Sequence, residues 1–295
     1  FYSFFFWMSQ ALFSLLFILI FTSFSKDSNI PLYAYLSSLI IISIFSFFVF
    51  QFLFNKEIKN DNESVENLKI KEILLIASPL MLAQAVQFIM SWTDKIMLGA
   101  LDTPAVIAGL TTNTSEIGVY HTAFKLSMFA TISLLAVKSI AAPKFAELYR
   151  NKDFSGLEKV TQQSTKLIFW TTLPLVLVFV FCSEFLMGIF GEEFRLGVLS
   201  FIILSAGRLV VAFSGAAGNL LQMCGKQVIF MNVAIIGSLI NIILNFVLIP
   251  IYGINGSAMA TMISIVIFNL LLVYYVKKEF GFYTFYIPFS KKLIK

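Results

Sequence analysis

Hydrophobic residues in this chain fall into eight long stretches that are separated by shorter polar segments. A helix needs roughly 20 residues to cross about 30 Å of hydrocarbon, and each stretch is long enough to do so. The pattern therefore predicts an all-α polytopic membrane protein with eight transmembrane helices. The predicted helices cover residues 1–24, 32–54, 73–99, 115–142, 161–188, 198–222, 229–250 and 256–276.

Basic residues alternate between the two sides of the predicted membrane. Segments after the second, fourth, sixth and eighth helices carry four, four, one and five lysines and arginines, whereas the other connections carry one, none, one and none. Cytoplasmic loops hold the Lys/Arg excess in membrane proteins. We therefore expect residues 55–72, residues 143–160 and the tail after Lys277 to be cytoplasmic, and the C-terminus to stay there.

Composition agrees with a membrane protein and excludes several other classes. Hydrophobic residues make up 59% of the chain and charged residues 13%, against about 25% charged in soluble domains. The net charge of +5 reflects the cytoplasmic loops, so we expect no nucleic-acid partner. Cys182 and Cys224 belong to opposite membrane faces and His121 has no second ligand nearby, so neither a disulfide, a metal nor another cofactor is expected.

Polar residues inside the predicted helices form stripes. In the third helix Gln84, Gln87, Ser91 and Asp94 fall within a sector of about 80°. Similar stripes contain Arg208 and Asn219 in the sixth helix and Asn241 and Asn245 in the seventh, and His121 and Lys125 share a face of the fourth. Such stripes suit the wall of a water-filled cavity. Hydrogen bonding between packed helices is an alternative that the pattern leaves open.

Two cations lie deep in the predicted helices. Lys125 and Arg208 are about nine and ten residues from the external helix ends, which places them roughly 13 to 15 Å deep. A cation at this depth costs at least about 2.5 to 3.5 kcal/mol, which favours an anionic ligand over a structural role, although Lys125 could reach Asp94. We expect His121 to be a cavity or packing histidine. Three other lysines are expected to reach the membrane interface without a function, namely Lys95, Lys138 and Lys166.

Three segments resemble a known family. NIILNFVLIPIYGINGSAMAT from Asn241, TDKIMLGAL from Thr93 and EIGVYHTAFKLS from Glu116 are similar to segments of polysaccharide transporters of the MOP superfamily, the Wzx-type O-antigen flippases. The similarity covers residues 73–276 well and residues 1–54 only in hydropathy. In physical terms, Pro250 ends a helix and Gly253 serves a tight turn.

The resemblance implies a flippase-type transporter of two six-helix lobes. Residues 1–54 would be the last two helices of the N-terminal lobe and residues 55–72 a cytoplasmic linker. Residues 73–276 would be the six-helix C-terminal lobe, and residues 277–295 a basic cytoplasmic tail. On this pattern the sequence is N-terminally incomplete by about four helices.

The resemblance also implies a substrate and a location. The substrate would be an oligosaccharide repeat unit on undecaprenyl diphosphate, moved from the inner to the outer leaflet of the bacterial cytoplasmic membrane for O-antigen and lipopolysaccharide biosynthesis. Arg208 and Lys125 would bind the diphosphate. The expected partners are this lipid-linked oligosaccharide, membrane lipids and a coupling ion, H⁺ or Na⁺. The other substrate-binding residues would be Gln84, Gln87, Asp94, His121, Asn219, Asn241 and Asn245.

Two other functions remain open at this point. A multidrug or cation antiporter of the same superfamily would need carboxylates in its cavity, whereas the deep charges here are positive. A polyprenyl-dependent membrane enzyme would need a catalytic group in a large external loop. The largest such loop, residues 100–114, offers only Asp102 as an ionisable side chain. We therefore expect a transporter and not an enzyme.

Overall fold

A computed structural model describes residues 2–24, 27, 29–58, 70–101, 103 and 113–286. All regular structure in these residues is helical. The chain divides into two compact units, residues 1–68 and residues 69–295. Five helices of the described chain are long and apolar enough to cross a membrane, within Ile30–Phe52, Glu116–Arg150, Phe154–Phe181, Glu192–Ser214 and Gln227–Phe280. The prediction of an all-α multi-pass membrane protein is confirmed at this level.

The first unit is a pair of apolar helices, α1 (Tyr2–Phe24) and α2 (Ile30–Ile58), that pack against each other. Ile30, Ala34 and Ser38 are buried, and their spacing of four residues puts them on one face of α2. Leu19 and Phe48, by contrast, are 64% and 65% exposed. Apolar side chains that are exposed in this way suit contact with lipid.

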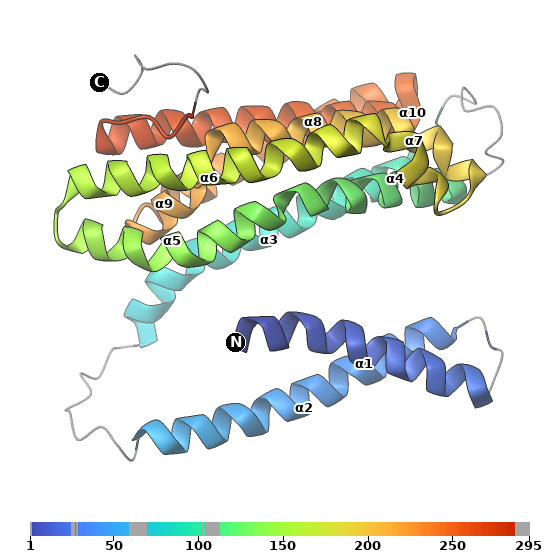
Figure 1. Ribbon diagram of the computed structural model, residues 1–295, viewed down its shortest axis with the longest axis horizontal. Coiled ribbons are helices and arrows are strands. Elements are labelled where there is room, and N and C mark those ends of the chain that lie inside the picture. The colour runs from blue at the N-terminus through green and yellow to red at the C-terminus, as the bar shows by residue number, and fades with distance from the viewer. Residues whose placement is uncertain are drawn as a thin grey trace. The chain divides into compact units, whose positions relative to one another are not determined.

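The second unit is a bundle of helices of different lengths (Figure 1). Its elements are α3 (Ile70–Ala100), α4 (Asn113–Met128), the 3₁₀ turn η1 (Phe129–Thr131), α5 (Ile132–Arg150), α6 (Phe154–Phe181), α7 (Ser183–Gly188), the 3₁₀ segment η2 (Glu192–Gly197), α8 (Val198–Ser214), α9 (Ala217–Met223) and α10 (Gln227–Phe280). Helix α8 contacts α4, α6 and α10, while α3 packs on α10 and α4.

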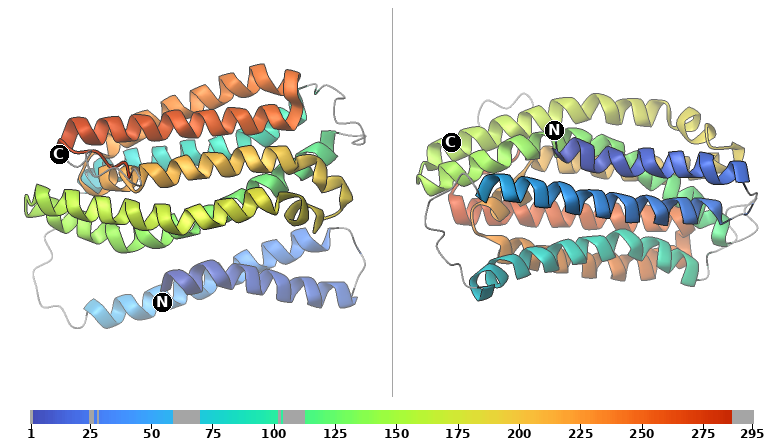
Figure 2. Two further views of the ribbon diagram at one scale, coloured as in Figure 1. Left: turned by 45° about the horizontal axis from the view of Figure 1, so that its top comes forward. Right: turned by 90° about the horizontal axis from the view of Figure 1, so that it is seen from below.

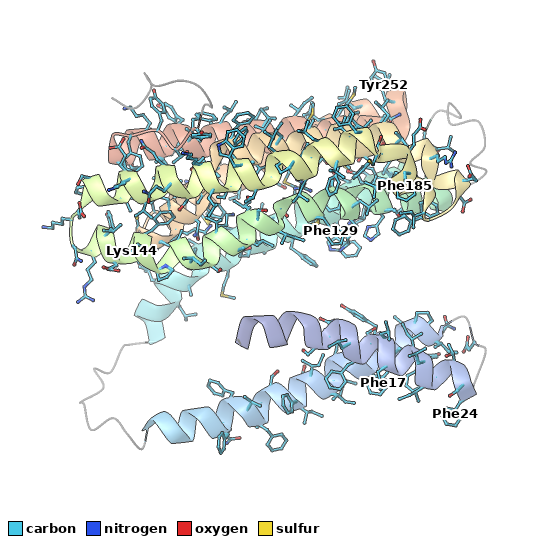
Figure 3. The ribbon with its side chains drawn as sticks, viewed as in Figure 1. Phe17, Phe24, Phe129, Lys144, Phe185 and Tyr252 are labelled. Atoms are coloured by element: carbon cyan, nitrogen blue, oxygen red, sulfur yellow. The ribbon has the colours of Figure 1, made fainter. Side chains whose placement is uncertain are left out.

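The bundle has two ends, which Figure 3 marks with labelled side chains. Lys144 lies near the turn between α5 and α6, and Phe185 and Tyr252 lie at the opposite end. We call these the Lys144 end and the Tyr252 end. Each end has its own apolar core. The core at the Lys144 end includes Phe145 and Leu221, and the core at the Tyr252 end includes Phe201 and Ile254.

Helix α10 is a hairpin of two arms. Its 54 residues would extend roughly 80 Å if straight, more than twice the hydrocarbon thickness. Gly253, with φ 56° and ψ −132°, interrupts the helix, and the two arms run side by side (Figure 2). Lys226 Nζ and Glu279 Oε2, at the two ends of α10, lie 2.6 Å apart. This hydrogen bond raises the pKa of Lys226.

Several helix boundaries differ from the predicted ones. Helix α5 continues to Arg150 and α6 begins at Phe154, so most of the segment 143–160 is helical and the connection is only residues 151–153. Asp153 begins α6 because its carboxylate accepts a hydrogen bond from the backbone N–H of Gly156 at 2.8 Å, which lowers the pKa of Asp153. The predicted sixth helix is divided at Gly215 into α8 and α9. Residues 59–69, within the predicted linker, lie outside the described residues, as does Asp102.

Candidate functional site

A buried carboxylate is held between α3, α4 and both arms of α10. Asp94 is 2% exposed. Its Oδ2 accepts hydrogen bonds from the Tyr120 hydroxyl at 2.8 Å and from Thr261 Oγ1 at 2.6 Å, and its Oδ1 accepts one from Asn245 Nδ2 at 2.8 Å. Three neutral donors therefore stabilise the charge of Asp94, and no cation in the described part of the chain forms an ion pair with it.

Two amide oxygens beside this carboxylate have no partner. Asn241 Nδ2 donates to Thr261 Oγ1 at 3.5 Å, and Asn245 Nδ2 also donates to the Asn241 carbonyl at 3.0 Å. Oδ1 of both asparagines is buried and accepts no hydrogen bond within the described structure. The Asp94 network, defined here as Asp94, Tyr120, Asn241, Asn245 and Thr261, thus contains spare oxygen acceptors as well as a negative charge.

A cavity of about 320 Å³ extends from this network into the bundle. Its polar lining comes from α3, η1, α5, α8 and the second arm of α10, and its remaining walls are largely apolar, with Phe124, Leu134 and Phe268 among them. We call it the lobe cavity. Its polar and charged lining residues are Gln87, Ser91, Asp94, Thr131, Lys138, Arg208, Thr261 and Asn269.

Arg208 brings to the lobe cavity a guanidinium that forms no salt bridge with any residue that the structure describes. Its Nε is buried without a hydrogen-bond partner, and the described residues include no salt bridge to it. The guanidinium carbon lies 5.4 Å from the centre of the Phe124 ring, a cation–π contact. Aromatic contact offsets only part of the desolvation of a buried cation, so an anion would be bound favourably here.

Lys138 also lines the lobe cavity, whereas the sequence predicted only that it reaches the membrane interface. That prediction took residue 142 as the helix end. Helix α5 instead continues to Arg150, twelve residues beyond Lys138 and about 18 Å along the axis.

A second group of cations lies on α3 and α4, away from the lobe cavity. Lys95 Nζ donates to the Ser91 carbonyl at 2.9 Å and lies 4.5 Å from the centre of the Trp92 ring. Lys125 is exposed and His121 is half-buried, with His121 Nδ1 unpartnered within the described residues. Neither Lys125 nor His121 lines the cavity that contains Arg208.

The predicted site residues thus divide into several groups. Asp94, Asn241 and Asn245 meet in the Asp94 network, and Gln87 and Arg208 share the lobe cavity with Asp94. Gln84 is exposed and is absent from the cavity lining. Asn219 Nδ2 instead donates to the Lys138 carbonyl at 3.3 Å, joining α9 to α5.

Besides Lys138, three residues of the Asp94 network or of the cavity lining were not predicted as site residues, although the sequence contained a partial signal for each: Tyr120, Thr261 and Asn269. Tyr120 lies one helical turn before Phe124 in the same segment as His121 and Lys125. Thr261 follows Ser257 by four residues in the last predicted helix, which puts the two hydroxyls on one face, and Asn269 lies about two turns further along that helix. Spacing placed these residues on helix faces, but it did not show which faces meet.

Three comparisons with known proteins agree with this geometry. A family model described as MatE matches residues 79–247, more than half of the chain. Two curated relatives are "Probable low-salt glycan biosynthesis flippase Agl15" of Haloferax volcanii and "Capsular polysaccharide biosynthesis protein CapF" of Staphylococcus aureus. The first is 26% identical, with 63% of this chain and 37% of the relative covered. The second is 25% identical, with 90% and 65% covered.

Solved structures share the fold. The outward-facing structure of a multidrug resistance MATE family transporter of the MOP superfamily aligns with a TM-score of 0.58 at 22% identity, covering 70% of this chain and 45% of that one. The chain spans about a third to two thirds of the length of the two curated relatives. The matches support a transporter rather than an enzyme. Because the MatE model matches more than half of the chain, including Asp94, Tyr120, Asn241 and Asn245, this chain belongs to the MatE family.

Proposed function

We propose that this chain is part of a flippase that moves a lipid-linked oligosaccharide across the bacterial cytoplasmic membrane. The substrate is a sugar repeat unit on undecaprenyl diphosphate, and the product feeds surface polysaccharide biosynthesis of the O-antigen or lipopolysaccharide type. The observation that carries the proposal is the guanidinium of Arg208, which lines the lobe cavity with Nε buried and unpartnered and with no salt bridge in the described chain. A diphosphate supplies the missing negative charge.

The lining of the lobe cavity supports a substrate with both polar and apolar parts. Gln87, Ser91 and Asn269 offer amide and hydroxyl groups to sugar hydroxyls, while Leu134 and Phe268 offer apolar contact. The relatives point the same way, since Agl15 is named a glycan biosynthesis flippase and CapF a capsular polysaccharide biosynthesis protein.

The proposal includes the two-lobe architecture with eight membrane spans. Residues 1–54 are the last two helices of the N-terminal lobe, residues 55–72 a cytoplasmic linker, residues 73–276 the C-terminal lobe, and residues 277–295 a cytoplasmic tail. The two arms of α10, which meet at Gly253, count as two spans.

A coupling ion, H⁺ or Na⁺, is also part of the proposal. The Asp94 network supports it, because a buried carboxylate beside the unpartnered oxygens of Asn241 and Asn245 offers the hard oxygen ligands that small cations prefer. The other predicted residues, Gln84, His121, Lys125 and Asn219, are proposed as secondary contacts along the transport path.

Arg208 provides the test. A hydrogen bond to a charged group contributes about 1.5 to 3 kcal/mol, so Arg208→Ala should weaken substrate binding roughly 10- to 150-fold. When expressed in a flippase-deficient strain, the Arg208→Ala protein should fail to restore surface polysaccharide. Arg208→Lys keeps the charge without the bidentate fork and should be intermediate. The gene is expressed from its complete reading frame, and membrane levels are measured alongside export.

The matched control is Arg195→Ala, which removes an arginine paired with Glu192 at an exposed site and should leave export intact. Normal export by Arg208→Ala at normal protein levels would show that Arg208 is structural. Uptake of a radiolabelled cationic drug, without rescue of polysaccharide, would instead favour the multidrug antiporter.

A further inference from the structure

We infer that Lys138 is a second anion-binding residue of the lobe cavity and makes the first contact with the diphosphate of the lipid substrate, before Arg208. This inference rests on the proposed function and assigns a role to a residue near the Lys144 end of the bundle. It makes the lobe cavity a path with two successive cations.

The surroundings of Lys138 leave its ammonium group without a partner. Its backbone carbonyl accepts the hydrogen bond from Asn219, which fixes α5 against α9 at this level. The side chain lines the lobe cavity, and within the described structure no hydrogen bond or salt bridge involves its Nζ. Lys144, two turns further along α5, is instead paired with Glu147 at 2.8 Å.

The charge balance of the cavity favours an anion. Its lining contains two cations, Lys138 and Arg208, and one carboxylate, Asp94. Three donors already satisfy Asp94, and neither cation forms an ion pair with it. Two cations against one carboxylate leave the lining with an excess of positive charge, in a largely apolar setting that strengthens its attraction for an anion.

The two cations lie at different levels of the bundle. Arg208 contacts the Phe124 ring, and Lys138 follows Phe124 by fourteen residues along α4, η1 and α5, about 20 Å at 1.5 Å per residue. On the other side of the cavity, Asn219, which contacts Lys138, follows Arg208 by eleven residues and lies beyond the break at Gly215. The two residues therefore belong to successive levels of the cavity, and a diphosphate that moves along the cavity meets them in turn.

The order follows from the ends of the bundle. Lys138 is nearer the Lys144 end, where the predicted excess of basic residues is cytoplasmic, and Arg208 is nearer the Asp94 network. A lipid-linked diphosphate that enters from the cytoplasmic leaflet meets Lys138 first. Met128, Leu134 and Leu135 line the wall between the two levels and suit the apolar part of such a ligand.

Binding kinetics test this assignment. The complete protein in lipid nanodiscs is immobilised, and association and dissociation of farnesyl diphosphate are followed by surface plasmon resonance. A charge at the entrance acts mainly on association and its salt dependence, whereas a buried charge acts mainly on dissociation. Lys138→Gln should slow association about 10-fold and weaken its salt dependence, with dissociation changed less than about 3-fold, whereas Arg208→Ala should mainly speed dissociation.

Controls separate charge from structure and lipid from free anion. Lys138→Arg should retain fast association, and Lys166→Gln, which neutralises an exposed lysine of α6 outside the cavity, should behave as the unchanged protein. Farnesol should not bind, and inorganic pyrophosphate should bind more weakly than farnesyl diphosphate. Melting temperatures are measured for every variant.

Each failure has a distinct meaning. Unchanged association in Lys138→Gln, or equal slowing in Lys138→Arg, would refute the assignment while the Arg208 site stands. Binding of farnesyl diphosphate that is unaffected by Arg208→Ala would refute the proposed function. Absence of binding to the unchanged protein would refute both, and pyrophosphate binding as tight as farnesyl diphosphate binding would show a free-anion site.

Discussion

At the scale of single residues, the Asp94 carboxylate joins three helical segments that are distant in the sequence. Its donors come from Tyr120, Asn245 and Thr261, so it links α3 to α4 and to both arms of α10. Because a hydrogen bond to an ionised group is about twice as strong as one between neutral groups, these contacts stabilise the Tyr252 side of the bundle.

Tyr120→Phe tests the structural part of this role. The substitution keeps the ring and removes one donor to Asp94, which should cost about 1.5 to 3 kcal/mol and lower the melting temperature of the detergent-purified protein. Tyr252→Phe, at an exposed tyrosine in the α10 turn, should leave the melting temperature unchanged. Equal melting temperatures for the two variants would mean that the Tyr120 hydroxyl contributes nothing to stability.

At the scale of elements, Gly215 sets the break between α8 and α9. Its φ is 67°, and a Cβ at this position would lie 2.1 Å from Thr165 Oγ1 on α6. Thr165 is fully buried, so it cannot move away. The close approach of α6 and the break between α8 and α9 therefore both require glycine. Since Gly215 and Gly218 line the lobe cavity, the same break shapes the cavity wall.

Three glycine-to-alanine substitutions compare the cost of backbone strain with the cost of a steric clash of the added Cβ. Gly118 lies within α4 with open space around it, so alanine there should be neutral or stabilising by about 0.4 to 1 kcal/mol. Gly225 has φ 74° and open space, so alanine should cost about 1 to 2 kcal/mol. Gly215→Ala adds overpacking of about 1 to 3 kcal/mol and should be the least stable. Thermal unfolding would give the order, and a Gly215→Ala protein as stable as Gly225→Ala would contradict the collision with Thr165.

At the scale of the whole molecule, the basic-residue pattern assigns the two ends of the bundle to opposite sides of the membrane. The α5–α6 turn at residues 151–153 lies at the Lys144 end, and η2 lies at the other end (Figure 1). The charge rule predicts that the Lys144 end is cytoplasmic.

Cysteine labelling tests this orientation. In a background with Cys182 and Cys224 replaced by serine, a membrane-impermeant maleimide should label Glu193→Cys in intact cells. It should label Asn151→Cys only after the cells are permeabilised. Asn151 and Glu193 are both exposed, so a difference in labelling between the two cysteines reports the side of the membrane and not burial in the protein. The opposite labelling pattern would invert the topology and, with it, the order of Lys138 and Arg208.

Part of the site could be read from helix periodicity. The stripe that contains Gln87 and Asp94 and the pair Asn241 and Asn245 follow from spacing alone, and both are found together around the buried carboxylate. Spacing did not show where Lys125 and Lys138 lie. Lys125 was expected to bind the diphosphate with Arg208 and is exposed outside the cavity lining. Lys138, for which no function was expected, lines the cavity.

The sequence by itself determined the helical class, the multi-pass character and which residues share a helix face, because hydrophobic burial and the 3.6-residue period act locally along the chain. Only the tertiary structure decided which faces meet. The pairing of Asp94 with Tyr120 and Thr261, and the placement of Arg208 and Lys138 along one cavity, depend on helix packing between residues up to 167 positions apart. Such packing is set by the shapes of the facing surfaces, including the breaks at Gly215 and Gly253, which a periodic pattern does not encode.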